Sequence, residues 1–197
     1  MMLGLIVAHD SKYGIGKDSK LPWKVPADID HFWHTIGQDP VIVGRKTWES
    51  AKKYFLKRRP NAVHIVISRG ASKDFDAIWV NSTTMAFRVL KNKTFAWVCG
   101  GSEIYKMFRP HVDIACETYI RCIGDCDRFV TSCWNSFNFE PYKQVDLPTK
   151  EGEPTATVRW SYRRPYSTDG SPFLDTYAYT SPKEQQYQKV INELCRL

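Results

Sequence analysis

Short apolar runs alternate with helical patterns along the first two-thirds of this chain, and this alternation constrains the fold more than any other feature. Runs of about four to eight apolar residues between turn residues are typical of buried strands. Because such strands alternate with helices, we expect an α/β fold: a single domain with a mostly parallel central sheet and helices on both faces. The predicted strands are Leu3–Ala8, Pro40–Gly44, Val63–Ser68, Ala77–Asn81, Thr94–Gly100 and Ile114–Ile120.

The helical patterns lie between these strands. Between Pro26 and Gly37, apolar residues recur at positions i, i+3, i+4 and i+7, which predicts a helix over Ala27–Ile36. Shorter helices are predicted over Lys46–Tyr54, Thr83–Leu90 and Ser102–Phe108.

The pattern changes after Asp125. Thr155–Arg164 and Phe173–Thr180 are predicted to form a C-terminal antiparallel hairpin, joined by a loop rich in turn residues. We therefore expect one domain over residues 1–180.

The last segment, residues 181–197, is a predicted helical extension. Ser181 is a capping residue, Pro182 stands at the first helical position, and apolar residues follow at helical spacing. We expect a monomer in which this apolar stripe packs on its own domain. Contact with a second copy through this helix is the alternative.

Charge and cysteine content narrow the function classes. The chain of 197 residues has 28 Lys and Arg against 21 Asp and Glu, a net charge of +7 that points to nucleic acid, a membrane surface or a phosphorylated small molecule. The apolar N-terminus ends at His9, short of the ~18 residues of a membrane span, and it has no basic leader. The six cysteines contain no CxxC pair. We expect a cytoplasmic protein with reduced thiols, no membrane partner and no metal site.

The segment from Gly14 to Asp28 is the first with chemical potential. Gly14 and Gly16 permit an unusual, mobile backbone that can cover a ligand. Asp28 stands in the first turn of a predicted helix among apolar side chains, where desolvation would raise its pKa and suit it to hold a proton. The alternative is that Asp28 only complements the helix N-terminus.

Glycines and cations collect at the ends of three other predicted strands. Gly44–Thr47 and Ser68–Gly70 combine backbone amides, hydroxyls and cations, which favours a ligand with more than one phosphate. In Val98–Tyr105, adjacent glycines precede a helix and permit close approach to a pyrophosphate. This segment is neither a GxGxxG fingerprint nor a P-loop.

Taken together and in this order, these segments resemble dihydrofolate reductase, over about residues 1–180. Asp rather than Glu at position 28 is similar to the bacterial and phage branch of that family. The most specific runs are Gly14-Ile15-Gly16, Leu21-Pro22-Trp23, Pro26-Ala27-Asp28 with Phe32, and Pro40 to Ser50.

The resemblance implies hydride transfer from NADPH to 7,8-dihydrofolate, giving 5,6,7,8-tetrahydrofolate, and it implies binding of antifolate inhibitors. Asp28 would bind the pterin and promote its protonation at N5, Trp23 would position a water, and Thr118 would support the carboxylate. The Gly14–Trp23 segment would be a lid, and the Gly100–Gly101 bond would be cis.

The resemblance also implies sets of contact residues. Arg45 and Arg69 would bind the ribose 2′-phosphate, which favours NADPH over NADH. Substrate contacts are expected from Ile6, Val7, Ala8, Asp28, Ile29 and Phe32, with Arg58 or Arg59 at the folate carboxylate. Cofactor contacts are expected from Ala8, Ile15, Gly16, Gly44, Arg45, Lys46, Thr47, Ser68, Arg69, Gly100, Gly101, Ser102, Ile104 and Tyr105.

The chain departs from the family pattern before its third predicted strand, where Pro-Gly-Arg is replaced by a longer segment containing Arg58 and Arg59. Two other functions stay open. A reductase of the same fold acting on a ribosylated pyrimidine in flavin synthesis needs no acidic group, so Asp28 argues against it. The second alternative is a non-catalytic protein that binds nucleic acid through its basic segments, although we do not expect nucleic acid as a partner.

Overall fold

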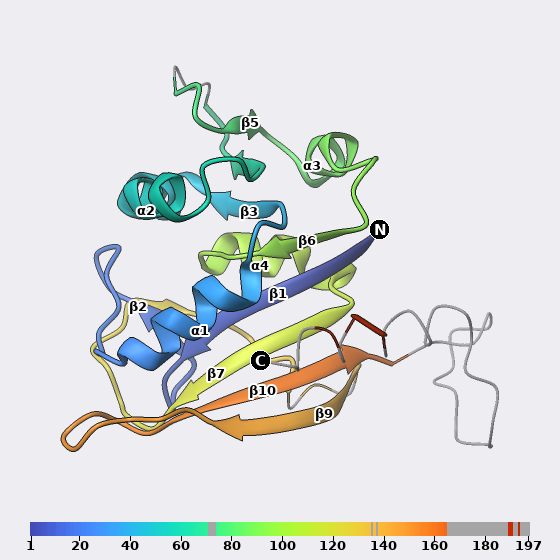
Figure 1. Ribbon diagram of the computed structural model, residues 1–197. Helices are drawn as coiled ribbons and strands as arrows, with labels where there is room; N and C mark the ends of the chain where they lie inside the picture. Colours follow the sequence, from blue (N-terminus) through green and yellow to red (C-terminus); the bar gives the residue numbers. More distant parts are fainter. Residues whose placement is uncertain (71–73, 135, 137, 165–188, 191–192, 194–197) are drawn as a thin grey trace, which may run out of the picture.

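An eight-stranded sheet in the order β5-β4-β3-β6-β1-β7-β10-β9 forms the centre of the molecule (Figure 1). This computed structural model describes residues 1–70, 74–134, 136, 138–164, 189–190 and 193. Neighbouring strands from β5 to β7 are parallel, whereas β10 is antiparallel to both β7 and β9. The strands are β1 (Met2–His9), β3 (Val41–Gly44), β4 (His64–Ile67), β5 (Ile78–Val80), β6 (Phe95–Val98), β7 (Ile114–Ile120), β9 (Phe139–Asp146) and β10 (Ala156–Arg163).

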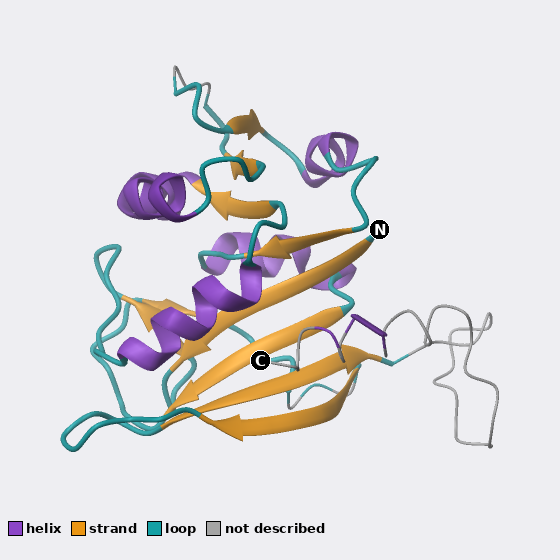
Figure 2. Cartoon of the chain, in the orientation of Figure 1, coloured by secondary structure: helices purple, strands orange, loops and turns teal. Residues whose placement is uncertain are grey.

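Helices cover both faces of this sheet (Figure 2). Because side chains alternate along a strand, Leu3 and Leu5 of β1 face one side and Ile6 faces the other. Leu3 and Leu5 share a core cluster with α3 and α4, and Ile6 shares one with α1 and α2. The helices are α1 (Pro26–Ile36), α2 (Arg45–Arg58), α3 (Thr83–Val89), α4 (Ser102–Phe108) and the short 3-10 helix η1 (Arg109–His111).

The parallel strands bring the ends of β1, β3, β4 and β6 to one edge of the sheet. Ligands of open α/β sheets bind at such an edge. A second, two-stranded sheet pairs β2 (Gly14–Gly16) with β8 (Arg128–Phe129) in antiparallel register. This small sheet joins the segment after β1 to the segment after β7.

The predicted strands of the parallel sheet and the four predicted helices are confirmed, with one difference in length. Helix α2 runs to Arg58 rather than Tyr54. No glycine or proline interrupts the chain before Pro60, so nothing in the sequence ends the helix at the predicted residue.

The predicted pairing in the C-terminal hairpin is wrong. The strand predicted over Thr155–Arg164 exists as β10, but it lies between β7 and β9, so both of its edges are already paired. Its hairpin partner is β9, which precedes it. The predicted strand Phe173–Thr180 lies outside the described residues.

The C-terminal extension is described at residues 189, 190 and 193, which are helical. Val190 is half-buried and packs against the cluster that contains Ile6, whereas Lys189 and Glu193 are exposed. This agrees with a helix whose apolar stripe faces its own domain. The rest of the predicted helix lies outside the described residues. Within the described part of the chain, no helix has the length and apolar character needed to cross a membrane.

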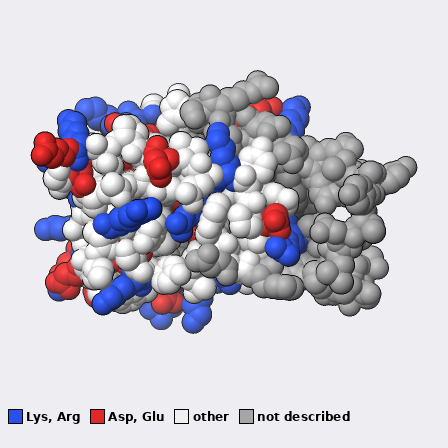
Figure 3. Space-filling view, turned by 90° about the horizontal axis from the view of Figure 1, so that it is seen from below, with Lys and Arg blue, Asp and Glu red and all other residues white. Residues whose placement is uncertain are grey.

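Charged side chains are scattered over the face shown in Figure 3. Lysines and arginines lie there among aspartates and glutamates, and some blue and red groups adjoin each other. On the described part of this face, the positive charge does not gather into one patch.

Candidate active site

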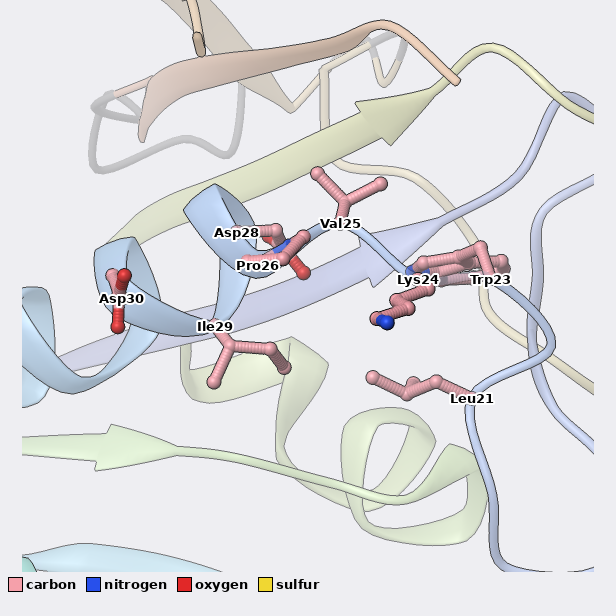
Figure 4. A pocket seen from close by; sticks show the side chains of 8 residues that line it. All are labelled: Leu21, Trp23, Lys24, Val25, Pro26, Asp28, Ile29 and Asp30. Atoms are coloured by element: carbon pink, nitrogen blue, oxygen red, sulfur yellow. The ribbon is translucent and has the colours of Figure 1, made fainter. Parts of the chain in front are cut away.

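A cavity of about 320 Å³ opens at the N-terminus of α1. In Figure 4, Asp28 and Ile29 reach it from α1, and Leu21, Trp23 and Lys24 reach it from the segment that precedes the helix. The lining is apolar apart from one lysine and two aspartates. The complete lining is Leu21, Trp23, Lys24, Val25, Pro26, Asp28, Ile29 and Asp30.

Asp28 is the buried charge of this cavity, with 5% of its surface exposed. Pro26 at the first helical position starts α1, which places Asp28 in the first turn. Burial raises the pKa of Asp28 to about 6, and a hydrogen bond from the Thr118 hydroxyl of β7 opposes this rise. Since desolvation outweighs this hydrogen bond, the pKa of the Asp28 carboxyl lies above its ordinary value. This favours the proton-holding interpretation over simple helix capping.

Trp23 places a second polar group beside the cavity. Its indole Nε1 is buried and has no hydrogen-bond partner among the described residues. Its ring packs against a small buried cluster of Val25, Ile120 and Ala156. A buried donor without a partner is costly, so this N–H is suited to bind a water or a ligand atom next to Asp28.

The predicted lid is held by the carboxylate of Asp10. Its oxygens accept hydrogen bonds from the backbone amides of Lys12, Gly14 and Gly124, each at 2.8 Å. Burial raises the pKa of Asp10, but the backbone amides together lower it below its ordinary value, so the carboxylate stays charged. Asp10 therefore fixes the lid to the loop that follows β7.

Two further contacts join the lid to this loop. The amide of Asp127 donates to the carbonyl of Gly16 at 3.1 Å, and Lys17 forms an ion pair with Asp125. Sequence reasoning missed this partner loop and missed Asp10. The signal for Asp10 was present, because an aspartate two to four residues before a glycine is a common turn former.

The glycine-rich segments meet at the carboxyl edge of the sheet. The amide of Gly44 donates to the carbonyl of Gly100 at 2.7 Å. A Cβ on Gly101 would lie 3.5 Å from the Thr47 hydroxyl, and a Cβ on Gly44 would lie 2.9 Å from Ile104. The Gly100–Gly101 bond is cis, as the resemblance implied. The edge is thus a close-packed backbone cradle at the starts of α2 and α4, and helix N-termini of this kind favour anionic ligands.

Predicted cofactor residues surround this cradle. The Tyr105 hydroxyl donates to the carbonyl of Ile6 at 2.8 Å, which ties α4 to β1. Ser68 follows β4, whose Ile67 pairs with Gly44, so it lies next to the start of α2. Ser102 begins α4. Ile15 is half-buried and packs against the core cluster that contains Leu3 and Leu5. Arg45, Lys46 and Arg69 are exposed around the same edge.

The predicted substrate residues divide between two faces of β1. Ile6 and Ala8 lie on the side of α1, with Phe32 half-buried in the cluster of Ile6. Val7 is buried in the opposite cluster, so its side chain points away from the cavity and only its backbone faces that side. Ile29 is 39% exposed on the cavity wall.

Arg58 and Arg59 have different environments at the C-terminus of α2. The Arg58 guanidinium is exposed and lies 5.4 Å from the ring of Trp33 on α1. Arg59 is 1% exposed and donates to the backbone carbonyls of Gly37 and Asp39 at the end of α1. Its Nη1 has no partner among the described residues. Arg59 therefore joins the ends of the two helices.

The structure describes no cluster of three or more His, Cys, Asp or Glu side chains suited to bind a metal ion, in the residues for which it gives positions.

Comparisons with known proteins bear on this arrangement. The model of the dihydrofolate reductase family matches residues 2–164. The chain belongs to the dihydrofolate reductase family. The dihydrofolate reductase of Haemophilus influenzae is 33% identical over 149 residues, which are 74% of this chain and 91% of that protein. The dihydrofolate reductase of Staphylococcus haemolyticus is 30% identical over 148 residues, which are 75% of this chain and 84% of that protein.

The fold has a counterpart among solved structures of this family. Dihydrofolate reductase from Enterococcus faecalis, complexed with NADP(H) and RAB-propyl, matches with a TM-score of 0.72 and 24% identity, covering 82% of this chain and 96% of that one. The predicted fold class is confirmed. Family and fold support dihydrofolate reduction as the activity of this enzyme. The family match ends at Arg164, directly after β10.

Proposed function

We propose that this enzyme transfers hydride from NADPH to 7,8-dihydrofolate, giving 5,6,7,8-tetrahydrofolate, and that Asp28 promotes protonation of the pterin at N5. One observation carries the proposal. The buried carboxyl group of Asp28, 5% exposed and with a pKa raised to about 6, lines the cavity. Protonation and hydride transfer together reduce the N5–C6 double bond.

The cradle around Gly44 and Gly101 fits a dinucleotide. Packing of Gly44 against Ile104 and of Gly101 against Thr47 leaves the amides at the starts of α2 and α4 close to the edge where a pyrophosphate would lie. NADP(H) accompanies the Enterococcus faecalis relative. When bound, NADPH supplies the hydride. Arg45 and Arg69 would hold its 2′-phosphate.

Asp28 and its neighbours would promote protonation of the pterin. The carboxylate accepts hydrogen bonds from the pterin 2-amino group and N3, while Thr118 fixes its orientation from β7. The unpartnered Nε1 of Trp23 would hold a water next to it. Closure of the lid held by Asp10 would exclude bulk solvent from the reacting face.

The far end of the substrate would lie along α1 toward the end of α2. Phe32 would contact the benzoyl ring, and the tail carboxylates would be bound by Arg58, whose guanidinium is exposed, rather than by the buried guanidinium of Arg59. Inhibitors that mimic the pterin would bind Asp28 through the same hydrogen bonds.

The test is an absorbance assay of NADPH oxidation on addition of dihydrofolate, with NADH as the control cofactor. We expect turnover with NADPH and slower turnover with NADH. Asp28→Asn should lose most turnover at neutral pH and keep NADPH binding, measured by titration. Folded protein that does not oxidise NADPH, or an Asp28→Asn variant with normal turnover, would contradict the proposal.

A further inference from the structure

Arg45 has a carboxylate partner at the edge where the cofactor phosphate is expected. Its Nη1 donates to both carboxylate oxygens of Glu49, at 3.0 and 3.3 Å. The two residues are four apart on α2, and about half of each side chain is exposed. Both contacts use Nη1, and the described residues provide no partner for Nε and Nη2, so that edge of the guanidinium is left for another anion.

Other cations near this edge have different surroundings. Lys52 is held by Asp74 at 2.9 Å and by Asp76 at 2.6 Å, about two turns along α2 from Arg45. For Lys46 and Arg69, the described residues provide no ion pair. Arg45 is therefore distinguished from Lys46 and Arg69 by a carboxylate that already shares its charge.

We propose that Glu49 is a specificity-determining residue that weakens binding of the cofactor 2′-phosphate through Arg45. This inference rests on the proposed function, because it takes Arg45 as a ligand of that phosphate. A phosphate on the Nε and Nη2 edge shares the single charge of the Arg45 guanidinium with the Glu49 carboxylate, so it gains less from Arg45 than it would without Glu49. If Arg45 instead turns to the phosphate, it gives up the ion pair.

In either arrangement, Glu49 lowers the affinity only for ligands that carry the 2′-phosphate. An exposed ion pair within one helix is weak, and interactions between exposed charges are screened by solvent. We therefore expect a modest effect, about threefold to tenfold in affinity. Glu49 would thus reduce the preference for NADPH over NADH and would speed release of the oxidised cofactor.

The experiment compares two small probes, adenosine 2′,5′-bisphosphate and adenosine 5′-phosphate, by calorimetric titration of the full chain. They differ only in the 2′-phosphate. Glu49→Gln should bind the bisphosphate about threefold to tenfold more tightly and bind the monophosphate unchanged. Glu49→Asp keeps the charge and should resemble the parent. Glu151→Gln removes the same charge from the exposed turn between β9 and β10 and should change neither affinity.

A double-mutant cycle tests whether the effect passes through Arg45. The gain from Glu49→Gln should disappear in an Arg45→Gln background. A gain that persists there, or that is equal for both probes, would mean a general field effect and would overturn the inference. Equal affinities of Glu49→Gln and the parent for the bisphosphate would also overturn the inference. If the parent does not prefer the bisphosphate at all, the proposed 2′-phosphate site itself fails, and the inference fails with it.

Discussion

Replacing Asp28 by Asn should stabilise this protein above pH 6 while removing its activity. The amide has the volume of the carboxyl and still accepts the Thr118 hydrogen bond, but it carries no charge. Burial, opposed by that hydrogen bond, raises the pKa of Asp28 from 3.8 to about 6. At about 1.36 kcal/mol per pKa unit, keeping this carboxylate ionised in the folded state costs about 3 kcal/mol.

The direction in which stability changes with pH follows from proton binding. Between pH 3.8 and about 6 the folded state holds a proton at Asp28 that the unfolded state has lost, so stability falls as pH rises through this window. Above this pH window, the folded state bears the full cost of keeping Asp28 ionised. Asp28→Asn should therefore be more stable than the parent by up to about 3 kcal/mol above pH 6, and the difference should vanish below pH 4.

Urea unfolding followed by tryptophan fluorescence at a series of pH values measures this difference. Asp30→Asn is the matched control, because Asp30 lies on the same helix and is exposed. It should show little difference from the parent at any pH. A stability difference for Asp28→Asn that does not change with pH, or a loss of stability above pH 6, would refute the claim that burial of a charge dominates this site.

Three other substitutions test the site. Thr118→Val removes the hydrogen bond that lowers the pKa of Asp28, so the pH above which turnover declines should move upward in a pH profile of kcat. Gly14→Ala places a Cβ 2.5 Å from the Cys126 sulfur and should lower kcat by disturbing the lid, with partial recovery in the double variant Gly14→Ala, Cys126→Gly. Arg58→Gln should raise KM for dihydrofolate several-fold and leave KM for NADPH unchanged, which steady-state kinetics would show.

The parallel half of the sheet was predictable because its strands are buried on both faces. Strands such as β3 and β4 therefore appear in the sequence as continuous apolar runs. The edge strand β9 was missed for the opposite reason. Most of its residues are exposed, and it contains Pro141, so it has neither an apolar run nor a clear alternation. Without β9, the pairing of β10 was assigned to the wrong neighbour.

The site was predictable to the extent that local chemistry determines it. Asp28 among apolar residues indicates a desolvated carboxyl, and the structure gives it the raised pKa that this implies. The environment of Arg59 was not predictable. Burial of an arginine is unusual, and it depends on two carbonyls at the end of α1 that come close only in the folded chain.

The net charge of +7 did not by itself separate nucleic acid from a phosphorylated small molecule. A nucleic-acid surface needs cations that are free to face successive phosphates. On α2, however, Lys52 is ion-paired with two aspartates and is not free in this way. On the face of Figure 3, cations lie among carboxylates. The cations next to the glycine cradle are therefore better placed for one compact phosphorylated ligand, and the arrangement favours the cofactor over a polymer.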